Sequence, residues 1–290
     1  MRVRSRKRFK QMYVEITNVC NLSCSFCPGT VRESGFMQRD IFERCVKEAA
    51  PLADQVYLHV MGEPLLHPEI GQFIAFCGTA NLPVAVTTNG TLLEEKGACL
   101  LDPAVRQINI SLHAHDAAFI ESRILPFVLR AAETSPELYI NLRLWDLESF
   151  EGASFADAIA LLERVFGASV PRNASAHRKG EVLRGRIYLH RDTVFSWPGD
   201  APPSGRGFCH GLGTHCAILC DGTVVPCCLD RDGDLALGNV ARRSLCEIID
   251  SPRAAAMNAG FDRGELVEDL CRRCSFCRRF DAKKGTMDKN

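Results

Sequence analysis

The sequence offers little that would direct the protein to a membrane or to a charged polymer. It contains no apolar run near the roughly 20 residues that span a bilayer. Its basic start lacks the apolar stretch and the small-residue cleavage site of a signal peptide. Lysine plus arginine and aspartate plus glutamate number 35 each, so no overall electric field favours nucleic acid. We therefore expect a cytoplasmic protein that binds neither a membrane nor nucleic acid.

Cysteine, in contrast, is abundant, with 15 among the 290 residues. So many cysteines would form a disulfide framework in a short secreted chain, but in a leaderless chain of this length they favour metal ligation. With 46% hydrophobic residues, the chain can bury the core of one large domain with a small appendage. Nine of the cysteines fall between Cys209 and Cys277, which sets a cysteine-rich C-terminal part apart from the rest.

Strand-like and helix-like patterns alternate through the first two thirds of the chain. Runs rich in β-branched residues predict strands at 12–17, 55–61, 83–88, 107–112, 139–144 and near 186–189. Apolar residues at helical spacing predict helices at 40–50, 69–80, 92–101 and 155–166. The alternation predicts βαβ units, hence a parallel sheet whose ligand site lies at the carboxyl ends of the strands.

Three cysteines follow the first expected strand with the spacing Cys-x3-Cys-x2-Cys, namely Cys20, Cys24 and Cys27. Three thiolates from one loop can hold three irons of a four-iron cluster and leave the fourth iron open to a ligand that is not protein. Structural zinc instead uses a closed set of four ligands, commonly two Cys-x2-Cys pairs. With Phe26 directly before the last cysteine, the segment resembles the signature of the radical S-adenosylmethionine (radical SAM) superfamily.

The resemblance implies that S-adenosylmethionine binds the open iron through its amino and carboxylate groups. Gly62-Glu63-Pro64 looks like the family's Gly-Gly-Glu-Pro motif, with Met61 in place of the first glycine. The residues that the resemblance assigns to S-adenosylmethionine are Gly62, Glu63, Asn89, Ser111 and Arg143. A carboxylate suits the ammonium group, and Arg143, costly in an apolar strand without a partner, suits the carboxylate. A structural ion pair is the alternative for Arg143, and an ordinary Asn-Gly turn is the alternative for Asn89.

The second group of cysteines surrounds a predicted hairpin. Residues 218–225 predict two short strands around an Asp-Gly turn, flanked by Cys209 and Cys227, and the pair Cys271-x2-Cys274 follows downstream. This arrangement resembles the auxiliary-cluster domains of the superfamily, named SPASM in the longer form and twitch in the shorter. It implies one auxiliary four-iron cluster held by these four thiolates, with no open iron. A closed zinc site is the alternative.

The other cysteines are left without a ligand role. Those surplus to the auxiliary cluster are Cys216, Cys220, Cys228 and Cys277, and their roles stay open. Cys216 is the alternative to Cys209 as a ligand, whereas we expect Cys228 and Cys277 to pack near the cluster. Helical patterns carry Cys45, Cys77, Cys99 and Cys246. Cysteine at such positions usually acts as a small buried side chain.

The resemblance implies an α/β fold, namely a partial (β/α)6 barrel of the radical SAM type with a small cysteine-rich C-terminal SPASM/twitch domain. The expected bounds are a basic N-terminal segment at 1–11, the barrel at 12–191, a linker at 192–207, the auxiliary cluster domain at 208–280 and a tail at 281–290.

The resemblance further implies an enzyme that reductively cleaves S-adenosylmethionine to a 5'-deoxyadenosyl radical, which abstracts a hydrogen from a substrate. The net reaction is then an oxidation (dehydrogenation) or a peptide modification. A low-potential electron donor such as flavodoxin or ferredoxin supplies the electron that reduces the first cluster. The substrate is a small molecule or a peptide, and the lack of a peptide-recognition domain before Met12 favours a compact one. His113 and Asp146, near strand ends, are the candidate catalytic residues. The alternative is a non-enzymatic iron-sulfur electron carrier or a zinc-stabilised binding module, which would not bind S-adenosylmethionine.

Overall fold

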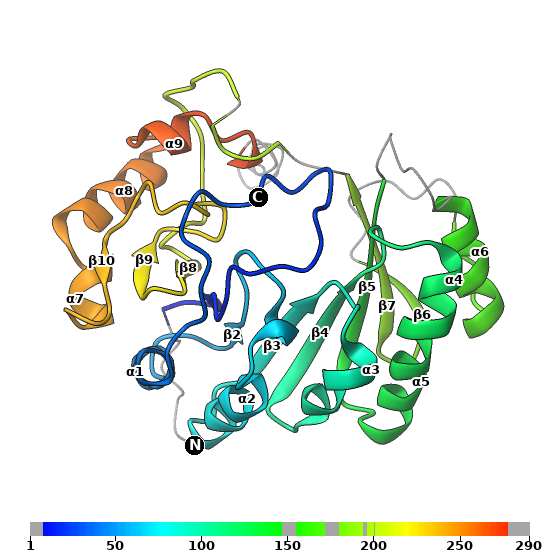
Figure 1. Ribbon diagram of the computed structural model, residues 1–290. Coiled ribbons are helices and arrows are strands. Elements are labelled where there is room, and N and C mark those ends of the chain that lie inside the picture. The colour runs from blue at the N-terminus through cyan, green and yellow to red at the C-terminus, as the bar shows by residue number, and fades with distance from the viewer. Residues whose placement is uncertain (1–7, 147–154, 172–179, 194–195, 200, 278–290) are drawn as a thin grey trace, which may run out of the picture. The chain divides into compact units, whose positions relative to one another are not determined.

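The computed structural model describes residues 8–146, 155–171, 180–193, 196–199 and 201–277 (Figure 1). The chain divides into two compact units. The first unit comprises Met1–Cys20, Cys27–Gly62 and Phe195–Asn290, and the second comprises Asn21–Phe26 and Glu63–Val194. The N-terminal strands and the cysteine-rich C-terminal part thus belong to the same unit. The domain bounds expected from the sequence stay predictions.

The second unit is a mostly parallel sheet with helices along one side (Figure 1). Strands β3 (Val84–Thr88), β4 (Val105–Ser111), β5 (Tyr139–Asp146) and β7 (Ile187–Thr193) run parallel in that order, and β6 (Glu181–Arg184) pairs antiparallel with β7. The helices are α2 (Ile70–Thr79), α3 (Leu93–Lys96), α4 (Ala117–Phe119), α5 (Leu125–Thr134) and α6 (Phe155–Phe166), with short 3-10 helices η1 (Pro64–Leu66) and η2 (Gly97–Leu101) and a π-helical turn η3 (Ile120–Ile124). Because these four strands are parallel, their carboxyl ends share one edge of the sheet.

The two faces of this sheet differ in polarity, because successive side chains along a strand point to opposite faces. One face carries apolar side chains such as Ile108, Ile110 and Leu142, which are fully buried. The opposite face carries Asn109 and Asn141, which are paired in register between β4 and β5 and are 7% and 9% exposed. The sheet therefore presents polar groups on the face that its helices do not cover.

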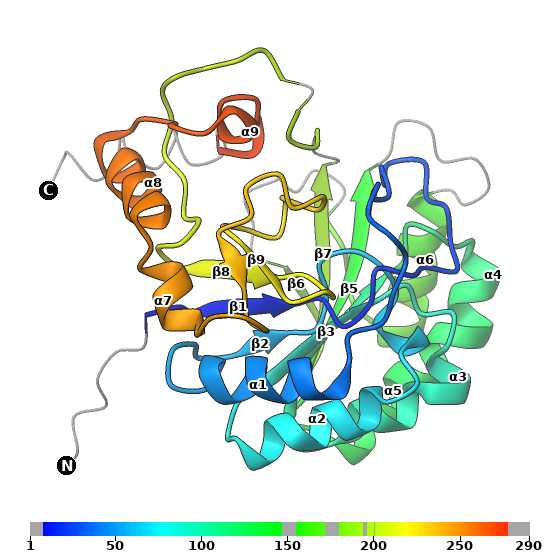
Figure 2. The same ribbon diagram turned by 60° about the vertical axis from the view of Figure 1, so that its left-hand side comes forward.

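The first unit builds its sheet from both ends of the chain. Strand β1 (Gln11–Val14) lies between β2 (Val56–Tyr57) and β8 (His215–Ile218) and runs parallel to both (Figure 2). Strand β8 pairs antiparallel with β9 (Thr223–Val225), and β9 pairs with β10 (Gly238–Asn239). The helices are α1 (Arg39–Ala49), α7 (Leu245–Ile249), α8 (Pro252–Arg263) and α9 (Asp269–Arg272). The cysteine-rich part thus extends the sheet that the first strand begins.

Most of the predicted elements are confirmed. The six predicted strands correspond to β1, β2, β3, β4, β5 and β7, the predicted hairpin corresponds to β8 and β9, and the helix predicted at 155–166 is α6. The helical segment from Ala117 to Thr134 was not predicted. Its start is capped by Asp116, whose Oδ1 accepts a hydrogen bond from the amide of Phe119 at 2.7 Å. A π-helical turn and Pro126 then interrupt the regular apolar spacing that predicts a helix.

Part of the basic N-terminal segment is tied to the first unit. Arg8 Nη1 lies 2.5 Å from Asp250 Oδ1, and Nη2 donates to the carbonyl of Ile249 at 3.1 Å. The residues Arg2, Arg4, Arg6 and Lys7 of that segment, like the tail at 281–290, lie outside the described residues.

Candidate active site

The three cysteines of the first group lie on the loop between β1 and α1. Cys20 and Cys27 are exposed, and Cys24 is half-buried. The base of this loop is fixed by Thr17 and Asn18. Thr17 Oγ1 donates to the carbonyl of Gly35 at 2.8 Å, and Asn18 Oδ1 accepts from the amide of Gly35 at 2.7 Å. Hydrogen bonds thus hold the base of the loop in place, while Cys20 and Cys27 remain accessible to a cluster from solvent.

Gly62 lies directly against the backbone that leads into this loop. Its φ of +75° is a conformation that side chains rarely adopt, and a Cβ at this position would lie 2.5 Å from the carbonyl oxygen of Thr17 and 2.8 Å from that of Val19. Only glycine allows this approach. The predicted backbone motif is thus located beside the residues that precede Cys20, while its contact with S-adenosylmethionine stays a prediction.

Glu63 connects the turn after β2 to the end of β3. Its Oε1 accepts hydrogen bonds from the amide of Leu65 at 3.0 Å and from Thr88 Oγ1 at 2.8 Å, and its Oε2 accepts from the amide of Asn89 at 2.6 Å. Burial raises the pKa of Glu63, and these three donors oppose that rise. The carboxylate that we expected to face an ammonium group therefore also holds the Asn89 turn in place.

Asn89 reaches the tip of the cysteine loop. Its Nδ2 donates to Asn21 Oδ1 at 2.8 Å, and its Oδ1 accepts from the amide of Thr91 at 3.0 Å. The carbonyl of Asn89 lies 2.6 Å from His115 Nε2, and the His115 ring stacks on Phe119. The structure thus gives this turn a role beyond that of an ordinary Asn-Gly turn, because it positions the residue that follows Cys20.

Four side chains of the second unit form a continuous stack. The rings of His113 and Trp145 are parallel with their centroids 4.7 Å apart, and Phe26 meets both edge-on at 4.9 and 5.2 Å. The guanidinium of Arg143 lies 4.9 Å from the Trp145 ring centroid, within the range of a cation–π contact. Sequence reasoning missed Trp145, although its position two residues after Arg143 puts both on one face of β5.

Protonation of His113 is expected to destabilise the folded protein in mild acid. Burial lowers the pKa of His113 to about 4 from its ordinary 6.5. Between these pH values the unfolded chain binds a proton that the folded chain does not, so the free energy of unfolding falls as pH falls, by ~2 kcal/mol from pH 7 to 4.5. His113→Gln should remove this share, as measured by chemical denaturation at both pH values. His215, whose pKa burial also lowers to about 4, keeps its own share in that variant. An unchanged pH dependence would contradict the prediction.

Polar side chains continue down the same face of the sheet. Asn141 Nδ2 donates to Asn109 Oδ1 at 2.9 Å, and Asn109 Nδ2 donates to Thr87 Oγ1 at 3.1 Å. Beside this row, Arg143 is paired in register with half-buried Ser111 on one side and with His190 on the other. Burial lowers the pKa of His190, and the nearby Arg143 lowers it further. Asp146 is the last residue of β5, and its side chain lies outside the described part of the chain.

The four predicted auxiliary ligands interact with one another in the first unit. Burial raises the pKa of Cys271, and the neighbouring Cys209 and Cys274 raise it further. Burial likewise raises the pKa of Cys227, with added contributions from Cys228, Cys209 and Cys271. These four thiols are thus electrostatic neighbours. These thiols keep their protons until a metal displaces them, so binding of a cluster would release protons.

A zinc ion and a four-iron cluster place different demands on these thiols. A zinc ion draws its sulfur ligands to about 2.3 Å from one centre. In a four-iron cluster, each thiolate binds an iron of its own. In the part of the chain that the structure describes, no three His, Cys, Asp or Glu side chains are placed to hold one metal ion.

The surplus cysteines have distinct environments. Cys216 is fully buried in β8, in register with Met12, and burial raises its pKa to about 12. Its position within a paired strand supports Cys209 as the ligand, an assignment that stays a prediction. Cys277 is buried and donates to the carbonyl of Cys274 at 3.0 Å. The buried-side-chain expectation holds for Cys45 and Cys77 but is wrong for Cys246, because Cys246 lies on the exposed side of α7 between the buried Leu245 and Ile248.

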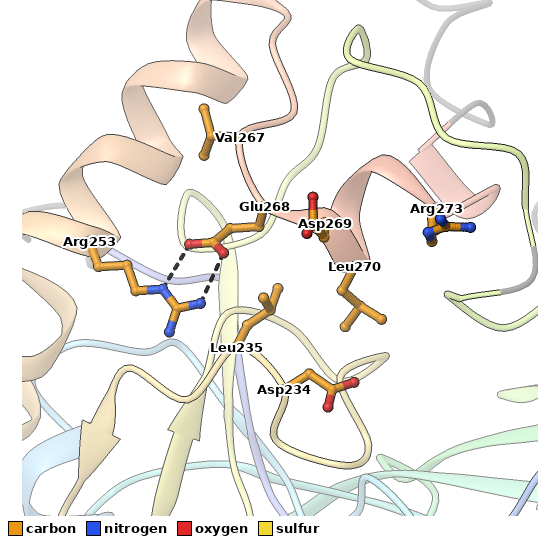
Figure 3. A pocket seen from close by; sticks show the side chains of 8 residues that line it. All are labelled: Asp234, Leu235, Arg253, Val267, Glu268, Asp269, Leu270 and Arg273. Atoms are coloured by element: carbon orange, nitrogen blue, oxygen red, sulfur yellow. Dashed lines mark hydrogen bonds and ion pairs between the residues drawn. The ribbon is translucent and has the colours of Figure 1, made fainter.

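A cavity of about 460 Å³ in the first unit borders the segment that carries Cys271 and Cys274 (Figure 3). Its lining residues are Asp234, Leu235, Arg253, Val267, Glu268, Asp269, Leu270 and Arg273. On one side, Arg253 holds Glu268 through two bonds of 2.7 and 2.9 Å. Asp230, almost fully buried, shapes the loop that contributes Asp234 and Leu235 by accepting from both amides. Sequence reasoning missed this cavity, since its residues are spread over distant segments.

Among the described residues, none of the helices is both long and apolar enough to cross a bilayer.

Comparisons with known proteins agree with this geometry. Residues 14–134 match the family model of the radical SAM superfamily, and residues 209–275 match the model of the SPASM iron-sulfur cluster-binding domain. BtrN in complex with AdoMet and 2-DOIA has a similar structure, with a TM-score of 0.60 and 17% identity over 93% of this chain and 94% of that chain. SuiB of Streptococcus suis bound to S-adenosylmethionine gives a TM-score of 0.62 with 16% identity, over 87% of this chain and 68% of that chain. Histidine-tagged anSMEcpe with bound AdoMet gives 0.52 with 16% identity, over 92% and 86%.

These matches settle the fold and the class of the chain. The structural likeness confirms the expected α/β fold of the radical SAM type. The two family models confirm the expected cofactors, namely a 4Fe-4S cluster with S-adenosylmethionine at the radical SAM site and an auxiliary iron-sulfur cluster. The chain therefore belongs to the radical SAM superfamily, as an enzyme whose C-terminal part is a SPASM iron-sulfur cluster-binding domain.

Proposed function

We propose that this enzyme dehydrogenates a compact, polar small molecule at the face of the second-unit sheet that carries Asn109, Asn141, Arg143 and His190. When bound, S-adenosylmethionine and its cluster supply a radical that takes a hydrogen atom from a substrate carbon, and the auxiliary cluster supplies an acceptor for the second electron. The observation that supports a small polar substrate is the chemistry of this face. Beside the aromatic rings of Trp145 and Tyr188, it offers amides, a guanidinium and an imidazole.

In this proposal, cysteine thiolates bind the two clusters, and residues at the ends of the strands bind S-adenosylmethionine. Cys20, Cys24 and Cys27 would hold the first cluster, and the thiols of Cys209, Cys227, Cys271 and Cys274 would hold the auxiliary one. The backbone at Gly62 and the side chains of Glu63, Asn89, Ser111 and Arg143 would bind S-adenosylmethionine. These assignments rest on the positions described above and on the match of 14–134 to the superfamily.

Proton acceptance is proposed for a neutral imidazole. Oxidation of an alcohol carbon releases a hydrogen atom, a proton and an electron, so a base must take the proton. Burial lowers the pKa of both His113 and His190, which keeps each imidazole neutral at neutral pH but also makes it a weaker base than an exposed histidine. The shift is smaller for His190, which makes His190 the better candidate of the two. His190 is paired in register with Arg143. Sequence reasoning missed it, because it follows the strand predicted near 186–189. Asp146 stays a candidate from its place at the end of β5.

Arg143→Met is expected to weaken binding of S-adenosylmethionine. A hydrogen bond to a charged group contributes about 1.5–3 kcal/mol, which corresponds to a ~10- to 150-fold rise in Kd. Arg143→Lys should lose less affinity, because it keeps the charge but not the planar fork. Equilibrium binding to the anaerobically reconstituted enzyme measures both. Unchanged affinity together with a lowered melting temperature would return Arg143 to a purely structural role.

Peptide modification is the second candidate. SuiB has a similar fold in its structure bound to the precursor peptide SuiA, with a TM-score of 0.59 and 16% identity over 92% of this chain and 71% of that chain. BtrN, in complex with 2-DOIA, is matched over 94% of its length. The nearly full-length match to BtrN supports the small-molecule proposal, as does the polar sheet face.

Transfer of deuterium tests the choice between these substrates. The reconstituted enzyme would be incubated with S-adenosylmethionine and a strong reductant, together with perdeuterated polyols and amino-substituted ring alcohols or with deuterated short peptides. We expect deuterium in 5'-deoxyadenosine from the first group, detected by mass spectrometry. Deuterium only from the peptides would overturn the small-molecule proposal and support the second candidate.

The electron donor and the compartment are proposed on chemical grounds. A low-potential flavodoxin or ferredoxin would reduce the first cluster. A reducing cytoplasm suits the many free thiols, because such an environment keeps cysteine available for metal ligation.

A further inference from the structure

A buried ion pair lies where β1 leads into the cysteine loop. Glu15, five residues before Cys20, is fully buried, and both of its carboxylate oxygens face Arg32 Nη2 at 2.7 and 2.8 Å. Arg32 follows Cys27 by five residues, so the pair connects the two ends of the loop that carries the three cysteines. A buried pair often stabilises a fold no more than a packed apolar pair would, so its value must be sought in the geometry that it imposes.

Glu15 also holds two other backbone segments of the first unit. Its Oε2 accepts from the amide of Met61 at 3.0 Å, and its Oε1 accepts from the amide of Cys220 at 3.2 Å. Met61 precedes Gly62, whose backbone lies against Thr17 and Val19. Cys220 belongs to the SPASM domain and follows β8. One carboxylate therefore fixes the loop entrance, the Met61–Gly62 turn and the SPASM hairpin relative to one another.

The segment after Cys27 is attached to the SPASM domain by polar contacts. Arg32 Nε donates to the carbonyl of Arg231 at 2.7 Å, and Arg32 Nη1 lies 3.6 Å from Cys220 Sγ. Asp232 Oδ1 accepts from Thr30 Oγ1 at 2.7 Å and from the amide of Val31 at 3.0 Å. The Val31 residue is 89% exposed, so apolar packing of its side chain does not provide this attachment. Directional hydrogen bonds hold the segment at a defined position.

We propose that Glu15 and Arg32 are positioning residues for cleavage of S-adenosylmethionine. They anchor the cysteine loop and the Met61–Gly62 turn to the SPASM domain, and so keep the groups that bind the cluster and the cosubstrate at fixed positions. This inference rests on the proposed roles of the loop cysteines and of Gly62. Neither Glu15 nor Arg32 is assigned a contact with the cosubstrate. They act through Cys27 and Gly62, and the SPASM domain therefore supports the first cluster mechanically as well as binding a cluster of its own.

The test is Glu15→Gln in the full-length enzyme reconstituted anaerobically with iron and sulfide. Glutamine keeps the size of the side chain but removes its charge. Its NH2 group, a donor, would face the backbone N–H of Met61 or Cys220, to which Glu15 now offers an acceptor. We expect a ~10- to 100-fold rise in KM for S-adenosylmethionine, since small displacements of binding groups cost this much. The iron content should be retained. The change that S-adenosylmethionine causes in the paramagnetic spectrum of the reduced first cluster should be diminished.

Glu181→Gln is the matched control. Glu181 pairs with Arg191 in the second unit, and the two side chains are 15% and 14% exposed, so loss of this pair should lower the melting temperature without changing KM. Asp232→Ala is the second test variant, because it releases Thr30 and Val31 while the Glu15–Arg32 pair stays in place. It also removes the ion pair of 3.2 Å between Asp232 and Arg231, whose side chain is 22% exposed. It should raise KM less than Glu15→Gln does, and it decides the matter if Glu15→Gln fails to fold.

Each outcome bears on the inference. A KM and a spectrum equal to those of the unaltered enzyme, in folded Glu15→Gln or in Asp232→Ala, would overturn it, and so would an equal rise of KM in Glu181→Gln. If the unaltered enzyme does not cleave S-adenosylmethionine under the same conditions, the proposed function fails and this inference fails with it. Cleavage by the unaltered enzyme with unaffected variants overturns the positioning role alone.

Discussion

Cys24→Ala is expected to abolish the formation of 5'-deoxyadenosine from S-adenosylmethionine, a loss on the order of 10³-fold or more. The loop supplies three thiolates, and a loop with two cannot hold a four-iron cluster with one open iron. Anaerobic reconstitution, reduction and chromatographic detection of 5'-deoxyadenosine measure the effect.

Cys246→Ala is the control for the loss of a thiol. Cys246 is exposed on α7 and has no assigned ligand role, so its replacement should leave cleavage and iron content at the level of the unaltered enzyme. Cleavage retained in Cys24→Ala would remove this loop from cluster binding.

The second large effect is expected in the iron content of a variant that lacks Cys20, Cys24 and Cys27. Two four-iron clusters give ~8 iron atoms per chain with zinc near zero, and the triple alanine variant should keep about half of that iron. It should also remain folded, because these three thiols are exposed or half-buried and contribute little to a core. Metal analysis together with circular dichroism checks both statements.

The remaining cluster of the triple variant should ignore S-adenosylmethionine. Four thiolates, from Cys209, Cys227, Cys271 and Cys274, leave no iron open for the cosubstrate to chelate. The paramagnetic spectrum of that cluster should therefore not change when S-adenosylmethionine is added. A clear change would show that one of its irons lacks a cysteine ligand.

Other metal counts would point to other sites. An iron content near ~12 in the unaltered enzyme would recruit the surplus cysteines into a third cluster. A content near ~4 with one zinc would make the C-terminal part a structural zinc site.

Local patterns were enough to predict the chemistry of the chain. The spacing of Cys20, Cys24 and Cys27 and the glycine at 62 are short-range features, and a loop of this kind needs only neighbouring residues to be recognised. Alternating strand and helix patterns predicted six strands in the right places for the same reason. The helix from Ala117 to Thr134 escaped because a π-helical turn and Pro126 disturb the periodicity on which such predictions depend.

The different surroundings of the C-terminal cysteines became visible only in the folded chain. Sequence spacing left Cys216 as an alternative to Cys209, and nothing local separates them. Pairing of β8 with β1 buries Cys216 opposite Met12, whereas Cys209 shares its surroundings with Cys271 and Cys274. Burial and neighbours, rather than residue type, decide which thiol is available to a metal.

By itself, the sequence determined the radical SAM loop, the positions of six strands along the chain and the candidate ligands, because each depends on residues close together in the chain. Only the tertiary structure decided that Glu15 bonds with Arg32 and Cys220, that Phe26 joins the stack of His113 and Trp145, and that β8 completes the sheet beside β1. The physical reason is that these contacts join residues far apart in the sequence, up to 205 positions for Glu15 and Cys220. No local periodicity carries information about such pairs, which form only when the whole chain packs.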